Sequence, residues 1–258
     1  MGHCKPAAGP PRAGPSAAAL GGPDHAADTV WGANAMDPAR RAVFSDHGSM
    51  RTGKLLLDRL EYRAQKGHNG YAWEGEAWYG GDYDRLWVKS QGEGGFGEAL
   101  ESAEVQALWS HALDPWFNLQ TGIRYDIRPK PDRAHLAIGV QGLVPYLFEV
   151  DAAAFLSDRG DLTARVEAEY DQRITNRLIL QPRAEINLAA QSVSSIGVGA
   201  GLSSLEAGLR LRYEIIPEFA PYLGVEYEWS LGDTADFARA AGEDVGGGRV
   251  VFGMRAWF

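Results

Sequence analysis

Beyond Met50, apolar and polar residues alternate with period two through most of the chain. The clearest case is residues 205–214, where four charged side chains share one face. The opposite face consists of Leu205, Ala207, Leu209, Leu211 and Tyr213. Residues 161–173 and 178–189 follow the same pattern. Since successive side chains of a strand point to opposite faces, this period predicts strands with one apolar and one polar face.

Twelve segments of this kind follow one another along the chain. They are residues 54–63, 70–80, 84–92, 98–113, 115–127, 133–144, 146–156, 161–173, 178–189, 204–214, 220–231 and 248–258. Most are about ten residues long, which is the length that a tilted strand needs to cross a bilayer. Strands of soluble proteins average only about five or six residues. The sequence therefore predicts an all-β fold, a twelve-stranded antiparallel transmembrane β-barrel over residues 51–258.

The connections between the predicted strands alternate between short turns and longer loops. The short turns fall near residues 81–82, 114–115, 144–145, 175–176 and 216–217. The loops fall near residues 67, 93–97, 128–133, 158–161, 191–203 and 232–247. Bacterial outer-membrane barrels have short periplasmic turns and longer external loops. We therefore expect a cell outer membrane location with the loops outside, and the terminal Phe258 resembles the sorting signal of such barrels.

Residues 1–50 lack the alternation and are predicted to form a disordered or partly helical N-terminal arm. Lys5–Pro23 is rich in Pro, Gly and Ala, and cannot bury enough apolar surface to offset the entropy lost on ordering. A short helix is expected at Asp37–Phe44, with Asp37 as its N-cap and Pro38 in its first position.

The composition is typical of a β-rich protein, and it excludes some classes of partner and metal site. Glycine accounts for 32 of the 258 residues, and there are 8 Trp, 10 Tyr and 9 Phe. The net charge of −9 argues against a nucleic-acid partner, because phosphate binding needs a basic surface. The single cysteine, Cys4, excludes a disulfide framework and a cysteine-rich metal site.

The polar face of a barrel in the outer membrane lines its lumen. The lumen-lining charged residues that the alternation predicts include Glu74, Glu76, Arg85, Arg124, Asp151, Arg165, Glu167, Arg183, Glu185, Arg210, Arg212 and Arg255. Acidic residues outnumber basic ones on this face, which favours cations. Because an unpaired charge away from water is costly, we expect most of these side chains to pair across strands. The lumen should then be salt-bridged rather than a wide pore.

Several segments of the chain resemble the outer-membrane copper resistance protein B family. The resemblance rests on DRLEYR (58–63), YAWEGEAWYGGD (71–82), GIRYD (122–126), LQPRAE (180–185) and GDTADFAR (232–239). It covers nearly all of residues 24–258. It implies an outer-membrane protein of the copper tolerance system that binds or exports excess copper ions. It also implies periplasmic copper-resistance proteins as partners and the lipid bilayer as surroundings.

One feature of that family is nearly missing from this chain. Members often carry an N-terminal region crowded with Met and His, the soft thioether and imidazole ligands that copper requires. The candidate copper ligands here are His47, Met50, Met36 and His135. His47 and Met50, three residues apart, could hold one ion, and the simpler alternative is that both are solvated linker residues.

The first residues also lack a leader of the usual kind. Residues 1–27 contain no leucine-rich core of a signal peptide. A start of the natural reading frame upstream of Met1 would explain both this absence and the shortage of Met and His, and we expect one.

Two other functions compete with copper handling. One is a passive or structural porin-like barrel without a metal role. The other is an outer-membrane lipid hydrolase, which needs Ser and His within hydrogen-bond reach. Ser110 and His111 are adjacent on a predicted strand and so point to opposite faces. The sequence therefore predicts that the protein is not an enzyme.

Overall fold

The computed structural model describes residues 21–48 and 50–258, and the chain divides into two compact units, residues 1–50 and 51–258. The first unit contains helices α2 (Asp28–Trp31) and α3 (Ala33–His47). Residues 5–20 of the predicted disordered tract lie outside the described residues. Over the part of the chain that is described, no helix is both long and apolar enough to cross a membrane.

The predicted start of the arm helix was wrong. Helix α3 begins at Ala33, and Pro38 lies inside it rather than in its first position. Gly32, at φ 78°, separates α2 from α3 and supplies the break at which the second helix starts. The Asp37 carboxylate accepts a hydrogen bond from Arg40 instead of capping a helix. Pro38 removes only one backbone hydrogen bond, a cost that a helix of this length can bear.

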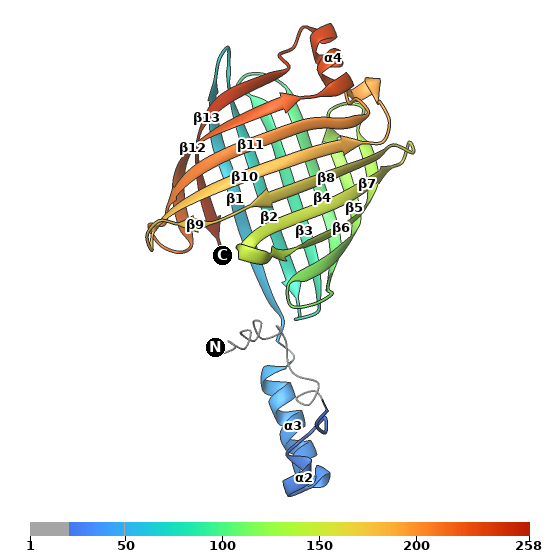
Figure 1. Cartoon of the computed structure of the whole chain (residues 1–258), viewed down its shortest axis with the longest axis vertical. Helices are drawn as coiled ribbons and strands as arrows, with labels where there is room; N and C mark the ends of the chain where they lie inside the picture. The colour runs from blue at the N-terminus through green and yellow to red at the C-terminus, as the bar shows by residue number, and fades with distance from the viewer. Residues whose placement is uncertain (1–20, 49) are drawn as a thin grey trace, which may run out of the picture. The chain divides into compact units, whose positions relative to one another are not determined.

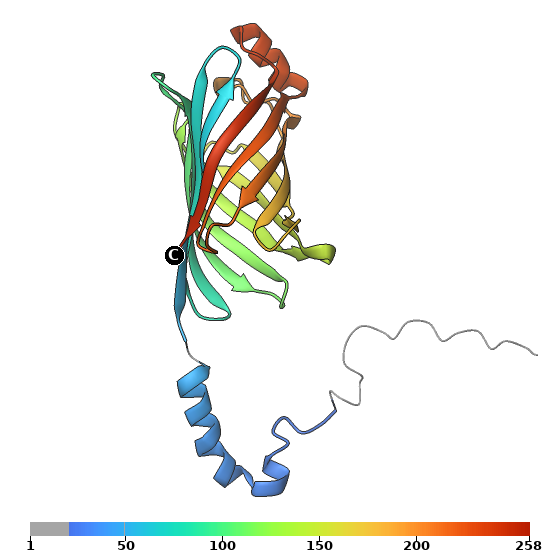
Figure 2. The same cartoon turned by 90° about the vertical axis from the view of Figure 1, so that its left-hand side faces the viewer.

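The second unit, described in full, is a closed barrel of twelve antiparallel strands, each paired with its neighbours in sequence (Figure 1). The strands are β1 (Thr52–Gln65), β2 (Asn69–Gly80), β3 (Asp84–Gly95), β4 (Leu100–Ala112), β5 (Phe117–Arg128), β6 (Arg133–Val144), β7 (Phe148–Ser157), β8 (Leu162–Glu169) with its continuation β9 (Gln172–Arg173), β10 (Leu178–Ala189), β11 (Gly201–Tyr213), β12 (Phe219–Ser230) and β13 (Gly246–Trp257). Pairing of β1 with β13 closes the wall, which Figure 2 shows from the side. The predicted fold is confirmed.

The segment expected as one strand over 161–173 is interrupted between β8 and β9. Both pieces pair with β10 in the same register, Glu169 with Arg183 and Gln172 with Leu180. Between these pairs, the Tyr170 amide donates to the Pro182 carbonyl at 3.1 Å. Proline has no N–H, so Pro182 cannot return the second bond of that pair. The ladder breaks there although the strand continues.

A β-bulge in β1 changes which of its residues face the lumen. The register with both neighbouring strands shifts between Leu57 and Leu60. As a result Asp58 and Arg59, although adjacent in sequence, both line lumen cavities. A bulge places an extra residue in one strand, which reverses the facing pattern beyond it. The alternation in the sequence did not predict that Asp58 faces the lumen.

Hairpin connections alternate between two ends of the barrel, which we call the loop end and the turn end. The loop end holds residues 66–68, 96–99, 129–132, 158–161, 190–200 and 231–245. The turn end holds residues 81–83, 113–116, 145–147, 174–177 and 214–218. Short 3-10 turns, η1 (Pro145–Leu147) and η2 (Ser194–Ile196), lie at the turn end and the loop end respectively.

The longest connection, between β12 and β13, contains a helix that the sequence analysis had treated as loop. Helix α4 spans Gly232–Ala241 and ends at Gly242, whose φ of 79° is the left-handed conformation that terminates helices. The Thr234 hydroxyl accepts a hydrogen bond from the Gly199 amide at 2.8 Å. The helix is therefore held against the β10–β11 loop at the loop end (Figure 1).

The outer surface of the barrel is apolar and its inner surface mostly polar. Leu209 is 41% exposed, whereas Arg210, the next residue, is 2% exposed. The exposed wall also includes Leu86, Ile123, Leu136, Leu211, Leu223 and Phe252. One apolar cluster lies inside, formed by Trp87, Leu108, Ala137 and Phe155. The faces thus follow the alternation in the sequence.

Candidate functional site in the barrel lumen

Side chains of the adjacent strands β1 and β2 and of the distant strand β10 meet at Glu74, which lies between the two lumen cavities. Arg59 on β1 donates from Nε to the Glu74 carboxylate on β2 at 2.8 Å. Arg183 on β10 approaches the same carboxylate from across the lumen, at 3.5 Å. Arg183 also pairs with Glu206 at 3.4 Å and with Glu167 at 2.5 Å. One carboxylate and two guanidinium groups therefore span the lumen.

A second group of ion pairs lies along the wall formed by β1, β11, β12 and β13. Arg210 donates to Glu61 at 2.7 Å and to Glu226 at 2.5 Å, and all three are almost fully buried. The Tyr222 hydroxyl donates to Glu61 at 3.0 Å. Arg249 donates to Glu226 at 2.6 Å. This wall is charged, but its charges are paired and hydrogen-bonded.

A third group surrounds Glu104 on β4. Arg165 on β8 reaches across to it with two parallel bonds of 3.0 Å, and Arg124 on β5 pairs with it at 2.7 Å. Arg165 also lies 3.5 Å from Glu185, a partner of Arg183. Such bidentate, charge-assisted bonds are the strong and geometrically specific kind. They connect the third group to the first.

These contacts form one network, which we call the charge belt. Its members are Glu61, Glu74, Glu104, Glu185, Glu206, Glu226, Arg59, Arg165, Arg183, Arg210 and Arg249. Removing one partner of a buried pair leaves an uncompensated charge, at a cost of about 3–5 kcal/mol. Breaking any one pair of the belt is therefore costly.

Two cavities meet at the charge belt. The turn-end cavity has a volume of about 110 Å³, and the loop-end cavity about 470 Å³. Both are lined by Glu74, Gln91, Phe155 and Arg165, which marks these residues as the boundary between them. The expectation of a salt-bridged interior thus agrees with the geometry.

Acidic side chains outnumber basic ones in the lining of the turn-end cavity. Its lining holds eight carboxylates and three basic side chains. They are Asp58, Glu74, Glu76, Glu104, Glu149, Asp151, Glu167 and Glu169, with Lys89, Arg165 and Arg255. Within the described chain, no basic group forms an ion pair with Glu76, Glu149 or Glu169. A cleft lined by one sign of charge concentrates counter-ions, here cations.

The lumen residues predicted from sequence occupy four kinds of position. Those lining the turn-end cavity are Glu74, Glu76, Asp151, Arg165, Glu167 and Arg255. Arg124 and Glu185 line the loop-end cavity. Arg183, Arg210 and Arg212 are buried, and Arg212 pairs with Asp171 at 2.5 Å. Arg85 lies over the Trp78 ring at 4.4 Å and donates to the Gly81 carbonyl at the turn end.

Arg249 is a lumen residue that the sequence analysis left out. It pairs with Glu206, Glu226 and Glu228 and lies on the same face of β13 as Arg255. The alternation that places Arg255 in the lumen also indicates Arg249. Asp58, by contrast, is brought inside only by the bulge, for which the sequence carries no clear pattern.

The candidate copper ligands do not gather in one place. His135 is buried in the loop-end cavity, with Nδ1 at 3.8 Å from Asp126 and without a hydrogen-bond partner among the described residues. Met36 and His47 line one groove on α3, but eleven residues of helix separate them by about 16 Å, too far to share an ion. Met50 is 62% exposed. The His47 and Met50 pair stays a prediction.

Ser110 and His111 have separate surroundings. Ser110 is buried, while His111 is only partly exposed and its Nδ1 lies 2.8 Å from Asp84. The ring of His111 stacks on Trp109. The two side chains do not form a nucleophile and base pair.

Two loops at the loop end are tied together through Asp161. Its carboxylate accepts hydrogen bonds from Arg133 and from Gln191, the latter at 3.2 Å. Arg133 also donates to the Ser195 hydroxyl at 2.9 Å. Partial burial opposes ionisation of Asp161, but these donors outweigh it and lower the pKa of the carboxyl below its ordinary value. We call this contact the loop latch.

Comparison with known proteins supports the barrel fold and identifies a family of similar sequences. A family model described as copper resistance protein B precursor matches residues 51–258. Copper resistance protein B of Escherichia coli is 45% identical over 230 residues, 86% of this chain and 77% of that protein. A copper resistance protein B homolog of Pseudomonas syringae pv. tomato is 43% identical over 228 residues, with the same coverage. The solved NanC porin has a similar fold, with a TM-score of 0.52 at 12% identity, over 79% of this chain and 99% of the porin.

Proposed function

Because the chain belongs to the copper resistance protein B family of the outer membrane and its lumen is crossed by the charge belt, we propose that it confers copper resistance by binding excess copper ions. In this proposal, copper is held at the membrane and does not pass through a permanently open pore. The observation that carries the proposal is the pairing of every arginine of the charge belt with carboxylates.

The electrostatics of the turn-end cavity support weak binding of cations. Glu76, Glu149 and Glu169 offer carboxylate oxygens that no described basic side chain neutralises by an ion pair. Carboxylates attract Cu(II), but they are hard ligands and suit Cu(I) poorly. The lumen is therefore a place where Cu(II) accumulates at low affinity.

The arm supplies the softer ligands. An imidazole and a thioether at His47 and Met50 match copper better than carboxylates do. We therefore expect the arm pair to contribute more affinity than any lumen carboxylate, and the arm and lumen together to bind at most one or two copper ions. Periplasmic copper-resistance proteins are the partners that such a protein would serve.

Calorimetric titration of the refolded chain in detergent tests this proposal. Wild type, His47→Ala/Met50→Leu and Glu76→Gln/Glu149→Gln are titrated with Cu(II), and with Cu(I) under anaerobic conditions. We expect the arm variant to lose most Cu(I) binding and the lumen variant to lose only weak Cu(II) binding. Loss of all binding in the lumen variant alone would contradict the arm assignment. Absence of binding in wild type would favour a passive porin-like barrel instead.

A further inference from the structure

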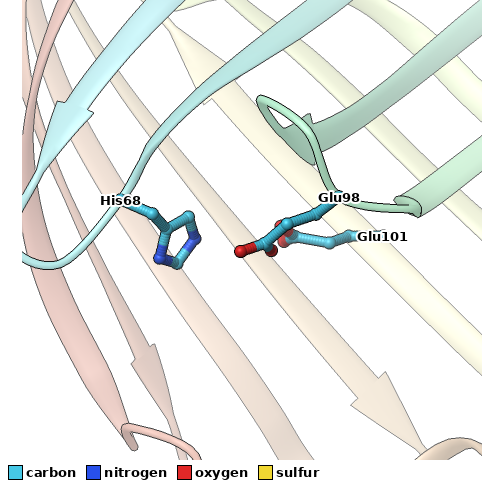
Figure 3. Close-up of side chains that lie close together, drawn as sticks. All are labelled: His68, Glu98 and Glu101. Atoms are coloured by element: carbon cyan, nitrogen blue, oxygen red, sulfur yellow. The ribbon is translucent and has the colours of Figure 1, made fainter.

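His68, Glu98 and Glu101 come together at the loop end, outside the lumen ion-pair network. His68 lies in the β1–β2 loop, Glu98 in the β3–β4 loop and Glu101 near the start of β4. One ligand atom of each residue lies within 4.8 Å of those of the other two. Figure 3 shows the imidazole ring and the two carboxylates directed toward one another. All three residues are exposed to solvent.

Backbone contacts between the two loops hold these residues near each other. The Phe96 amide donates to the Asn69 carbonyl at 3.0 Å, which ties the β3–β4 loop to the start of β2. The Glu98 amide donates to the Gly95 carbonyl at 3.2 Å, closing a turn over Gly97 at φ 85°. The loops are thus fixed by the strands from which they emerge.

Gly95 makes room for the ligand side chains. A Cβ at this position would approach the Glu98 carboxylate to 2.8 Å and Cδ2 of His68 to 3.3 Å. A side chain would therefore displace both groups. Because residue 95 is glycine, the imidazole and the carboxylate lie over the same stretch of backbone.

The two carboxylates lack the basic partners that their neighbours have. In the described part of the chain, no basic side chain pairs with Glu98 or Glu101, whereas nearby Glu93 pairs with Arg63. Two unit charges about 4 Å apart repel each other by about 1 kcal/mol even in water. The Gln65 amide nitrogen lies 3.1 Å from Nε2 of His68 and can only donate, so it occupies the lone pair of that ring nitrogen, and a metal ion at Nε2 would displace this contact.

We propose that His68, Glu98 and Glu101 bind one divalent transition-metal ion, with Cu(II) preferred over Zn(II). One imidazole nitrogen and two carboxylate oxygens suit borderline divalent ions, and the absence of sulfur among them disfavours Cu(I). A divalent ion would also neutralise the two unpaired carboxylates. Water fills the remaining coordination positions, so the ion exchanges freely with the surroundings. The site shares only Glu101 with the lining of the loop-end cavity and no residue with the turn-end cavity or the arm pair, and either proposal can fail without the other.

Electron paramagnetic resonance of the full chain in detergent, loaded with less than one equivalent of Cu(II), tests the site. All variants carry His3→Ala, because a free amine with histidine in third position chelates Cu(II) by itself. We compare His68→Gln and Glu98→Gln/Glu101→Gln with Glu243→Gln/Asp244→Asn. The last is a matched control that removes two exposed carboxylates from another loop of the same end.

In the His47→Ala/Met50→Leu background, which removes the arm imidazole, the site predicts nitrogen hyperfine coupling that His68→Gln abolishes. It also predicts an affinity for Cu(II) at least about tenfold lower in Glu98→Gln/Glu101→Gln, unchanged in the control, and competition by Zn(II). His47→Ala/Met50→Leu should leave this signal intact, which separates the site from the arm ligands. Unaltered nitrogen coupling in His68→Gln, or an equal loss of affinity in the control, would overturn the proposal. Heat-dependent electrophoretic mobility verifies that each variant is folded.

Discussion

The side chain at each strand position is suited either to the outer wall or to the lumen of the barrel. Leu209 and Arg210 show this most directly. They are neighbours on β11, yet one is exposed on the wall and the other pairs with Glu61 and Glu226 inside. Alternation alone predicted these positions from the sequence. The partners of Arg210 were not predictable, because they lie on β1 and β12 and depend on barrel closure and register.

Leu209→Arg should therefore lower the free energy of unfolding in bilayers by about 2–4 kcal/mol, the usual cost of a basic residue at the midplane of the lipid face. Arg210→Met should cost about 3–5 kcal/mol for a different reason, because it leaves buried carboxylates unpaired. In the double variant Arg210→Met/Glu61→Gln, part of that loss should be recovered. Urea titrations in lipid vesicles measure these three variants and the single variant Glu61→Gln. A loss in the double variant equal to the sum of the two single losses would contradict the coupling of Arg210 with Glu61.

At the scale of elements, the twelve strands were predicted from the sequence, and the departures have local causes. Pro182 interrupts the ladder between β8 and β9, and the bulge at Asp58 changes the facing of β1. Helix α4 was missed because its contacts come from the β10–β11 loop. The cluster of His68, Glu98 and Glu101 was missed for a similar reason, since two separate loops approach only through strand pairing. Local periodicity carries no information on such contacts.

The loop latch at Asp161 gives a prediction at this scale. The pKa of the Asp161 carboxyl is lowered in the folded protein. The latch is therefore fully formed above the ordinary carboxyl pKa of about 3.9. It is lost as the pH falls through the lower pKa that Asp161 has in the folded protein. At neutral pH, Asp161→Asn should increase amide hydrogen exchange in residues 190–200 severalfold. Asp158→Asn, an exposed carboxylate in the same loop, is the matched control. Equal exchange in both variants would show that the latch does not order the loop.

For the whole molecule, the position of the longest connections predicts the orientation in the membrane. The loop end, with α4, should face the exterior, and the turn end the periplasm. In a Cys4→Ser background, Ala240→Cys should react with an impermeant thiol reagent on intact cells. Asn176→Cys at the turn end should react only after the outer membrane is opened. Both positions are exposed. Equal labelling of the two on intact cells would reverse or refute this topology.

The central claim is that the charge belt keeps the lumen closed to free passage of copper. Copper entry into proteoliposomes that contain a copper-sensitive dye measures this directly. For wild type, Cu(II) entry should not exceed that into protein-free liposomes, whereas Arg59→Ala/Arg183→Ala, which removes both partners of Glu74, should leak. Heat-dependent mobility confirms that the variant is folded, and an ionophore gives the maximal rate. Rapid Cu(II) entry through the wild-type barrel, comparable with that through the variant, would contradict the account and indicate a conducting channel.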